Sequence, residues 1–538
     1  MGHGKGKEQK ATERGTTMRS TFSGLNISVL GMQSQRKATD ITAHNVANAS
    51  TEGFSRQRPA IVATPPMSYS GAGQVGTGAI VENIERIRDG FLDKQLRDEK
   101  ELLGYWDARK EGLDKIEKLF MEPGDTGFNT VMGRFFDAWQ DLSKNAESSP
   151  VRTQLMEISQ TLINNVNHLN GQLDDLGRDT NDMIRIQADD INGISEQIAQ
   201  LNQQIVRVTS RGDSANDLMD RRDVLLDELS DIIDCKVVHG KNGAANILFR
   251  GRDLVRENSY NEIKTVYDEN NDVNLFWDMK GILEEINIER KDSLASSRDT
   301  LEGLYSVRDE VTWYEDQFEI LVDSLVNVVN QQHREGYNLE GETDVDFFTW
   351  DERLDQWKVS QDIVDDVSRI SAAYYEDGLE EGEEVGIANG ENALNIAQIR
   401  DQRLLRVYNE VDEDGRLKVD EDGNFIEIDE DDIKDFEGDY KLRYRMPGED
   451  EIGQTSLENF YRDSVSTLGA KSQESIRMVE NQSALVTQLE NRRESISGVS
   501  LDEEMSNLIR FQHAYQAGAR IINTIDAMLD TIINRMGA

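Results

Sequence analysis

A seven-residue repeat of large apolar side chains follows Pro150 and constrains the fold of this chain more than any other feature. Positions seven apart lie on one face of an α-helix, so the repeat predicts a single long helix with an apolar seam. The seam shifts phase once, near residue 183, and its 54 residues would span roughly 80 Å at the helical rise. Its members are Leu155, Leu162, Leu169, Leu176 and Met183, then Ile184, Ile191, Ile198 and Ile205, with Ile194, Leu201 and Val208 three positions after members of the second series. Other parts of the chain must cover so long a seam.

Helical spacing of apolar residues also occurs near both ends of the chain. The stretches that show it are 22–46, 88–120, 294–332 and 457–538. Between residues 236 and 290, short β-prone runs alternate with Gly, Asn and Asp turns, a pattern typical of strands and hairpins. The sequence therefore predicts an α+β multidomain protein. Its N- and C-terminal helices are expected to pair into a long, coiled-coil-like helical stem, with β-rich domains inserted in the middle.

Changes in these patterns divide the chain into segments. Residues 1–17 are polar, rich in glycine and lysine and without periodicity, so we expect a disordered extension there, and Met18 would serve equally well as the initiator. The other predicted units are 18–60 with 500–538 as terminal helical segments, 61–235 with 294–336 and 455–499 as a helical stem domain, and 236–293 and 337–454 as inserted β-rich outer domains.

The chain carries 103 acidic and 59 basic side chains, for a net charge of −44. Such a charge repels nucleic acids and anionic membrane surfaces, so neither is expected as a partner. The acidic excess is uneven, because residues 18–60 carry +3 and residues 500–538 carry −2, whereas residues 61–499 carry −47. At physiological salt, charges closer than about 8 Å are poorly screened, so acidic segments of identical chains repel each other at contact distance. The near-neutral ends can therefore pack closely between chains, while the acidic middle faces solvent.

Motifs for catalysis or cofactor binding are weak throughout the sequence. The glycine-rich run from Gly73 to Gly78 follows a Pro-Pro loop, so a tight turn is favoured over a nucleotide site. The acidic runs 412–415 and 420–423 lack the ligand pattern of a calcium loop. The single cysteine, Cys235, excludes an internal disulfide and has no histidine companion in a recognised motif. We therefore expect no cofactor, no metal and no enzymatic activity. No apolar run approaches the roughly 20 residues of a membrane helix, so we expect no membrane insertion.

The strongest motifs lie at the two ends of the chain. Residues 45–56 read Asn45-Val-Ala-Asn48-Ala-Ser-Thr51-Glu-Gly53-Phe54-Ser-Arg56, and a capping box, Ser500-Leu-Asp-Glu503, opens the last helix. These ends resemble the axial proteins of the bacterial flagellum, whose N-terminal pattern is N-x-A-N-x-x-T-x-G-[FY]-x-R. Four further runs narrow the resemblance to the family of flagellar hook-associated protein 1: residues 20–26, residues 73–78, Arg86-Ile-Arg-Asp89 and Asn330-Gln-Gln-His333.

The resemblance implies a non-enzymatic structural subunit of the hook–filament junction that polymerises on the distal hook and adapts it to the next junction protein and the filament. The implied partners are further copies of the same chain in a ring or layer, the hook protein, hook-associated protein 3 with the filament side, and a flagellar export chaperone. The implied location is extracellular, on the flagellum, after type III export without a cleaved signal peptide. Another flagellar axial protein, such as hook-associated protein 3 or a hook subunit, and a non-flagellar coiled-coil adaptor stay open as alternatives.

The resemblance also implies roles for two sets of residues. Asn45, Asn48, Thr51 and Gly53 are expected to shape the turn after the first helix, and Phe54 and Arg56 to follow as contact positions. In the last helix, Leu501, Leu508, Tyr515, Ile522 and Leu529 repeat at seven and form an apolar stripe. Periodicity alone would fit this stripe into a coiled coil within one chain. The resemblance implies instead that the stripe packs against other subunits and, before export, against the chaperone.

Overall fold

The computed structural model describes residues 22–531, except 70–72, 121–126, 269, 280, 289–297, 352, 355, 376–385, 387, 411–417, 419–426, 429–439 and 446–453. The predicted extension 1–17 and the acidic runs 412–415 and 420–423 lie outside the described residues.

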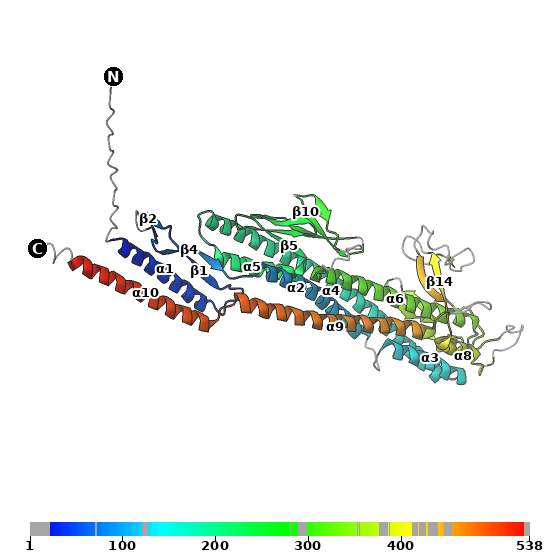
Figure 1. Ribbon diagram of the computed structural model, residues 1–538. Helices are drawn as coiled ribbons and strands as arrows, with labels where there is room; N and C mark the ends of the chain where they lie inside the picture. Colours follow the sequence, from blue (N-terminus) through cyan, green and yellow to red (C-terminus); the bar gives the residue numbers. More distant parts are fainter. Residues whose placement is uncertain are drawn as a thin grey trace, which may run out of the picture.

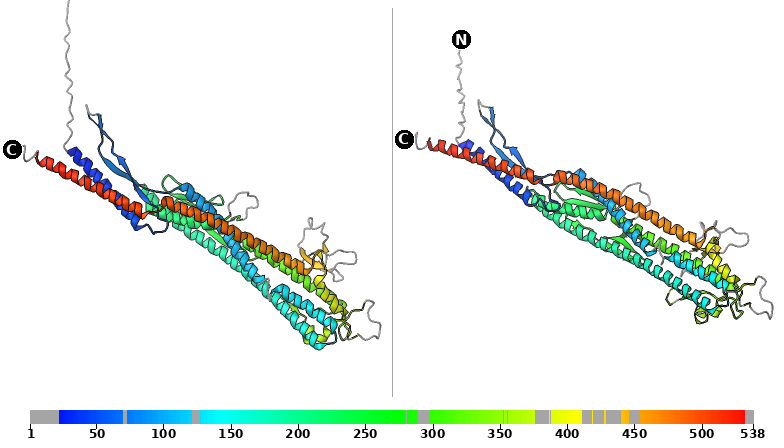
Figure 2. Two further views of the ribbon diagram at one scale, coloured as in Figure 1. Left: turned by 60° about the horizontal axis from the view of Figure 1, so that its bottom comes forward. Right: turned by 90° about the horizontal axis from the view of Figure 1, so that it is seen from below.

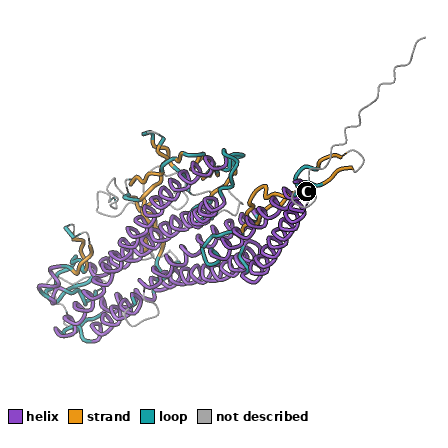
Figure 3. The backbone as a smooth tube through the Cα atoms, turned by 90° about the vertical axis from the view of Figure 1, so that its left-hand side faces the viewer, coloured by secondary structure: helices purple, strands orange, loops and turns teal. Residues whose placement is uncertain are grey.

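Long helices run side by side along an elongated body, and strands lie at intervals along it (Figures 1 and 3). The helices are α1 (Phe22–Ala47), α2 (Gly90–Phe120), α3 (Phe128–Lys144), α4 (Ser149–Thr209), α5 (Asn216–Ile232), α6 (Thr300–Glu335), α7 (Gln361–Asp365), α8 (Glu391–Gln398), α9 (Leu457–Ser497) and α10 (Leu501–Asp530), with short 3₁₀ turns at Val367–Arg369 and Ile399–Asp401. The strands are β1 (Gln57–Ala63), β2 (Met67–Tyr69), β3 (Gly73–Val75), β4 (Ala79–Arg86), β5 (Cys235–His239), β6 (Ala245–Phe249), β7 (Arg252–Arg256), β8 (Ser259–Tyr260), β9 (Ile263–Tyr267), β10 (Val273–Asp278), β11 (Leu283–Glu285), β12 (Phe348–Asp351), β13 (Gln356–Val359), β14 (Leu405–Glu410), β15 (Glu427–Ile428) and β16 (Tyr440–Arg445).

The predicted seam lies on α4, a helix of 61 residues. Its first series, from Leu155 to Leu176, is buried in a core formed with α2, α3, α6 and α9, which we call the far core. Its second series, from Ile184 to Ile198, is buried in a separate core with α5, α6 and strands β6, β7, β9 and β10, which we call the near core. Ile205, the last member of the series, is also fully buried. The predicted phase shift at Met183 therefore coincides with the boundary between the two cores.

The strands form small antiparallel sheets rather than one large sheet. The four-stranded sheet β5-β6-β7-β8 and the three-stranded sheet β11-β10-β9 contribute to the near core, between α5 and α6 in the sequence. The hairpin β12-β13 and the sheet β15-β14-β16 lie at the end of the body that also holds α3 and α8 (Figure 1). Long terminal helices with sheets in the middle of the chain confirm the predicted α+β class.

The two chain ends lie together. Helices α1 and α10 run along each other, and we call this pair the terminal rod (Figures 1 and 2). Strands β1 to β4 (residues 57–86) form a two-stranded ribbon that packs on α1, with β1 paired to β4 and β2 paired to β3. The predicted domain boundaries stay a prediction, although β4, grouped there with the stem, packs on α1 in this fold.

The run Asn330–His333 on α6 anchors the segment that follows this helix. Asn330 accepts hydrogen bonds from the backbone N–H groups of Phe347 and Phe348 at 3.0 and 2.9 Å. The buried His333 ring accepts a bond at Nε2 from the backbone N–H of Ser371, so its proton lies on Nδ1, which donates to the Val345 carbonyl at 2.6 Å. Burial lowers the pKa of His333 to about 4, which keeps this ring neutral.

Candidate assembly interface

Helices α1 and α10 of the terminal rod approach each other closely where glycines interrupt their apolar faces. A Cβ atom added at Gly518 would lie 2.6 Å from Cγ of Met32. One added at Gly24 would lie 3.4 Å from Cδ1 of Ile525. Because Gly24 meets Ile525 and Met32 meets Gly518, the two helices are antiparallel.

The predicted stripe on α10 is only partly covered by α1. Leu508, Ile522 and Leu529 are half-buried. Ile522 and Leu529 lie one turn beyond Gly518 and Ile525, on the face that meets α1. In contrast, Leu501 is 53% exposed and Tyr515 is 39% exposed. Within one chain, α1 therefore covers only part of the stripe, and the rest is exposed to solvent.

Further apolar side chains of α10 face away from α1. Met505, Ile509, Ile521 and Met528 are each at least half exposed. Among the described residues of this helix only Glu504 is fully buried. A helix with so much apolar surface in water needs a second partner to cover it.

The motif after α1 forms a tight turn. Gly53 has a φ of +70°, and a Cβ atom there would lie 2.1 Å from Cγ2 of Val224. Only glycine fits both the backbone conformation and the space. The Asn48 side chain donates to the carbonyl of His44 at 3.0 Å, and the Thr51 hydroxyl donates to Oδ1 of Asn48 at 3.3 Å.

Asn45 and Arg56 connect this turn to the start of α10. The buried Asn45 amide donates to the Gln57 carbonyl at 2.9 Å and to Glu504 at 3.1 Å, and its oxygen accepts from the Gln57 N–H at 3.0 Å. Arg56 donates to Glu504 at 2.8 Å and to Glu503 at 2.7 Å. The structure thus brings together motif residues that lie about 450 positions apart in sequence, as 459 separate Asn45 from Glu504.

The geometry also bears on Ser500 and Phe54, two residues of the terminal motifs. Ser500 caps α10 by accepting a bond from the Glu503 N–H, but the Glu503 carboxylate pairs with Arg56 rather than completing a reciprocal capping box. Phe54 packs edge-on against the His44 ring, with 5.5 Å between ring centroids. In this chain Phe54 therefore steadies the turn at the end of α1.

A buried set of ion pairs joins the ribbon to the stem, and we call it the ionic joint: Arg86, Arg88, Asp93, Asp220 and Asp223. Arg86 donates to Asp220 and Asp223, both at 2.8 Å. Arg88 donates to Asp223 at 2.8 Å and to Asp93 at 3.0 Å. Burial alone would raise the pKa of Asp223, but the guanidinium groups of Arg88 and Arg86 outweigh it and hold that pKa below its usual range.

The joint also connects to the motif turn and to α9. Asp220 accepts a bond from the backbone N–H of Ser55 at 3.1 Å. On α5, one turn after Asp223, Asp227 pairs with Arg97 of α2 at 2.7 Å and with Arg493 of α9 at 2.6 Å. The ribbon, α2, α5 and α9 are therefore held together where the terminal rod meets the stem.

No structural role was predicted for the run Arg86-Ile-Arg-Asp89, and its acidic partners were not predicted either. The available signal was the spacing of Asp220, Asp223 and Asp227, which places three carboxylates on one face of a predicted helix. A local pattern cannot predict that these arginines pair with those carboxylates, because 134 positions separate Arg86 from Asp220 in the sequence.

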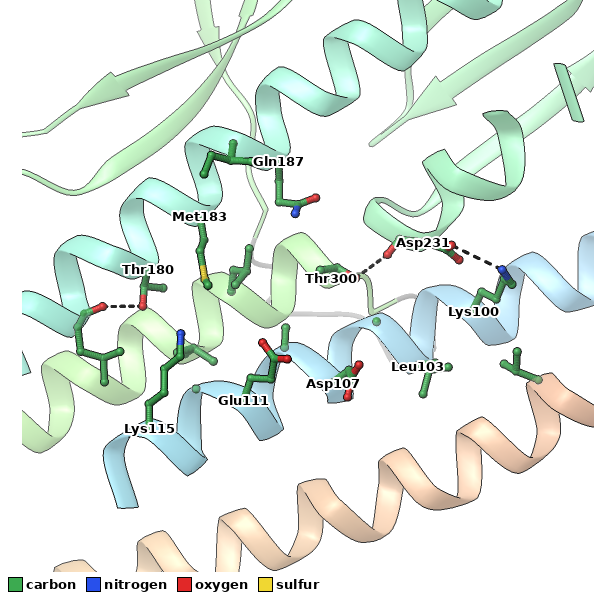
Figure 4. Close-up of a pocket in the computed structure, with 18 of the residues that line it drawn as sticks. Lys100, Leu103, Asp107, Glu111, Lys115, Thr180, Met183, Gln187, Asp231 and Thr300 are labelled. Atoms are coloured by element: carbon green, nitrogen blue, oxygen red, sulfur yellow. Dashed lines mark hydrogen bonds and ion pairs between the residues drawn. The ribbon is translucent and has the colours of Figure 1, made fainter. Parts of the chain in front are cut away.

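Two grooves lie near these residues. One, of about 520 Å³, is lined by His44, Asn48, Thr51 and Phe54 of the motif and by the outer faces of α4 and α5. The other, of about 670 Å³, lies between stem helices (Figure 4). There Lys100 lies 3.6 Å from Asp231, whose carbonyl accepts a bond from Thr300. The lining of this second groove mixes apolar and charged side chains, as is common where the surfaces of packed helices meet.

The described residues contain no group of three or more His, Cys, Asp or Glu side chains placed to hold a metal ion. Burial, reinforced by the nearby Glu101 carboxylate, raises the pKa of the Cys235 thiol, which makes the thiolate scarce at neutral pH. Of the helices that the structure describes, none has the combined length and apolar character needed to span a membrane.

Known proteins are similar to this chain over nearly its whole length. Flagellar hook-associated protein 1 of Bacillus subtilis (strain 168) is 29% identical over 557 residues, covering 97% of this chain and 99% of the relative. That of Escherichia coli (strain K12) is 27% identical over 548 residues, covering 95% and 99%. The family model "Flagellar hook-associated protein FlgK helical domain" matches residues 113–348. The chain is therefore similar to this family over nearly its whole length.

Two shorter family models match the terminal rod. "Flagella basal body rod protein" matches residues 25–54, which hold most of α1 and the motif turn. "Flagellar basal body rod FlgEFG protein C-terminal" matches residues 492–536, which hold α10. The rod is thus the part that this chain has in common with other axial proteins of the flagellum. The near full-length relatives favour the hook-associated protein 1 family over the hook subunit and hook-associated protein 3.

A solved structure agrees on the fold. The flagellar hook junction protein FlgK from Burkholderia pseudomallei has a TM-score of 0.52 and 15% sequence identity, covering 75% of this chain and 100% of that chain. At this identity the likeness concerns the arrangement of helices and sheets.

Proposed function

We propose that this chain is a structural subunit of the bacterial flagellum at the hook–filament junction. It polymerises on the distal hook and adapts the hook to the next junction protein and to the filament. The observation that carries this proposal is the terminal rod, which pairs α1 with α10 and leaves large apolar side chains of α10 exposed. Similarity to hook-associated protein 1 over nearly the whole chain supports the place of assembly.

Assembly through the rod follows from elementary energetics. Covering apolar surface stabilises a contact by roughly 25 cal/mol per Å². In a single chain α1 covers one face of α10, so the remaining surface contributes only when other copies pack against it. The near-neutral charge of the rod favours such packing, whereas the −47 carried by residues 61–499 opposes close approach elsewhere.

The ionic joint has a supporting role in this proposal. Its ion pairs fix the ribbon and the motif turn to α2 and α5. When rods pack between copies, a stiff connection transfers their arrangement to the stems. The motif residues Asn45, Gly53 and Arg56 act in the same way by holding the start of α10 against the end of α1.

The partners in this proposal are further copies of the chain, the hook protein on one side, and hook-associated protein 3 with the filament on the other. A flagellar export chaperone would cover the stripe of α10 before secretion, because the same apolar face needs protection from water. Export would use the flagellar type III route without a cleaved signal. The role is structural, with no reaction catalysed.

Electron microscopy of the purified full-length chain added to isolated hook–basal bodies tests this function. We expect a new layer of density at the distal end of the hook. The variant Met505→Glu with Ile509→Glu places two charges on the exposed face of α10 and should abolish this layer. Leu354→Glu, at an equally exposed turn between β12 and β13, is the matched control and should leave it intact. A wild-type chain that adds nothing to hooks would refute the proposal.

A further inference from the structure

The ribbon that packs on α1 has an unusual charge pattern. Residues 59–81 contain no Asp, Glu, Lys or Arg, which makes this the longest uncharged run in a chain of which 30% is charged. Residues 20–35, which include the first half of α1, form another uncharged run of 16 residues. The two runs lie together, because Gly78 of the ribbon packs against Ile27 and Leu30 of α1.

The ribbon is braced on one side. Ser34 of α1 donates a hydrogen bond to the carbonyl of Ala79 at 2.9 Å. Across the ribbon, the Thr64 N–H donates to the Gly78 carbonyl at 3.0 Å, and the hydroxyls of Thr64 and Thr77 lie 2.6 Å apart. The base of the ribbon is therefore fixed in orientation relative to the rod.

Beyond these contacts, both faces of the ribbon expose apolar side chains. Figure 2 shows the ribbon leaving the surface of the rod toward its tip, away from the stem. Ile61 on β1 and Ile80 on β4 are 40% and 38% exposed. Val62 pairs with Ile80 and Ile61 pairs with Val81, so the two exposed isoleucines lie on opposite faces of the ribbon. An apolar surface without charge thus projects from an otherwise strongly acidic molecule.

We propose that this uncharged ribbon is a contact surface for a second copy of the chain, and that it packs on the exposed side of that copy's α10. This inference rests on the proposed function, in which copies assemble around their rods. It adds a second surface to the assembly, contributed by residues 59–69 and 73–81 rather than by the terminal helices.

Charge and apolar character identify the occupant. Two copies, each with a net charge of −44, repel each other wherever their acidic surfaces meet. Burying any charged side chain in the contact would add a further cost. The ribbon avoids both costs, because none of its residues from 59 to 81 carries charge. The exposed side of α10 offers matching chemistry through Met505, Ile509, Ile521 and Met528, and α1 of its own chain does not cover them.

Photo-crosslinking on assembled hooks tests the contact directly. A benzophenone amino acid is placed at position 61 of the full-length chain, and unlabelled and ¹⁵N-labelled copies are mixed before addition to hook–basal bodies. We expect crosslinked peptides of mixed isotope composition that join position 61 to residues 501–530. Adducts within a single copy alone, or adducts with a hook subunit, would overturn the inference.

A matched pair of substitutions gives an independent test. Ile80→Glu should lower occupancy of hook tips by about tenfold or more, equivalent to at least one decade in the binding constant. Ile282→Glu adds the same charge at a more exposed isoleucine between β10 and β11 and should leave occupancy unchanged. Ile80→Thr keeps a β-branched, uncharged residue in the strand and should retain assembly. Normal occupancy with Ile80→Glu, while wild type also assembles, overturns the ribbon contact and leaves the proposed function standing.

If the Ile80→Glu chain has a lowered melting temperature, the crosslinking result decides alone, because it uses a chain with wild-type Ile80. If wild type itself fails to add to hooks, the proposed function is refuted. The two failures are therefore distinguishable.

Discussion

Helices α4 and α10 carry the same kind of heptad pattern, but the two apolar faces differ in how far the fold buries them. The α4 seam is buried along its length, in the far core up to Leu176 and in the near core from Ile184 to Ile198, and Ile205 beyond it is buried as well. The α10 stripe is half-buried at Leu508, Ile522 and Leu529 and exposed at Leu501 and Tyr515. An apolar repeat thus predicts a helix and the face it will bury, but not whether its own chain supplies the cover.

The difference lies in the number of neighbours. Helix α4 packs against α2, α3, α5, α6 and the inserted strands, so each turn of its seam finds a partner. Helix α10 has α1 as its main partner. One flanking helix covers about one face, which leaves the rest of an apolar helix open to solvent or to other molecules.

The largest effect expected from a single substitution is in the far core. Phe135 is fully buried, and its ring packs on Phe136, Trp139 and Phe348 with centroid distances of 5.2, 6.3 and 5.8 Å. Phe135→Ala should lower the free energy of unfolding of the isolated chain by about 3–5 kcal/mol, because it leaves a cavity that the surrounding rings cannot fill. Urea unfolding followed by circular dichroism measures it. A loss below about 1 kcal/mol would mean that the far core is loosely packed.

Acid should weaken the same region through His333. Burial lowers the pKa of His333 to about 4 in the folded chain, from an ordinary value of 6.5. Between these pH values the unfolded chain binds more protons, so the free energy of unfolding falls as pH falls. The stabilisation is complete above pH 6.5, and its loss reaches about 3 kcal/mol at pH 4. Urea unfolding of wild type and His333→Gln across this range should show a shallower slope for the variant. Parallel slopes would exclude His333 as the cause.

A smaller effect is expected at the ionic joint. Arg88→Gln leaves Asp93 and Asp223 with one charged hydrogen-bond donor fewer, while Asp223 keeps Arg86, and should cost about 1–3 kcal/mol of unfolding free energy. Arg178→Gln is the control, since Arg178 is an exposed residue paired with Asp174 and Asp175 on the outer face of α4. We expect no measurable change in the control. Equal unfolding midpoints for both variants would show that the joint does not stabilise the connection between ribbon and stem.

Sequence patterns predicted much of this architecture because the signals are local. The α4 seam, its phase shift at Met183 and the turn at Gly53 each follow from residues within a few turns of one another. The α+β class follows from the alternation of helical and β-prone stretches.

The ionic joint and the contact of Arg56 with Glu503 were not predicted, because their partners lie far apart in the sequence. The division of the α10 stripe was not predicted either. Periodicity defines a face of the helix, whereas exposure depends on which elements the rest of the fold places beside it. Leu508 and Tyr515 belong to one heptad series, yet only Leu508 lies under α1 deeply enough to be half-buried.

The smallest effect on the isolated chain is expected in the rod. Because α1 and α10 form a unit with little buried core of its own, changes there should leave the main unfolding transition of the stem unaffected. The proposed energy of the stripe appears only when copies assemble. Packing in the stem therefore stabilises the isolated chain, whereas packing on the rod stabilises the assembly.

The double variant Leu508→Ala with Ile522→Ala tests this central claim most directly, through two readouts on the same preparation. Differential scanning calorimetry of the isolated full-length chain should give the wild-type melting temperature, and electron microscopy should find no added layer on hooks. In an ordinary core, two such substitutions would each cost about 2–5 kcal/mol and lower the melting temperature clearly. A destabilised chain that still assembles on hooks at wild-type levels would contradict the account and place α10 in an internal core.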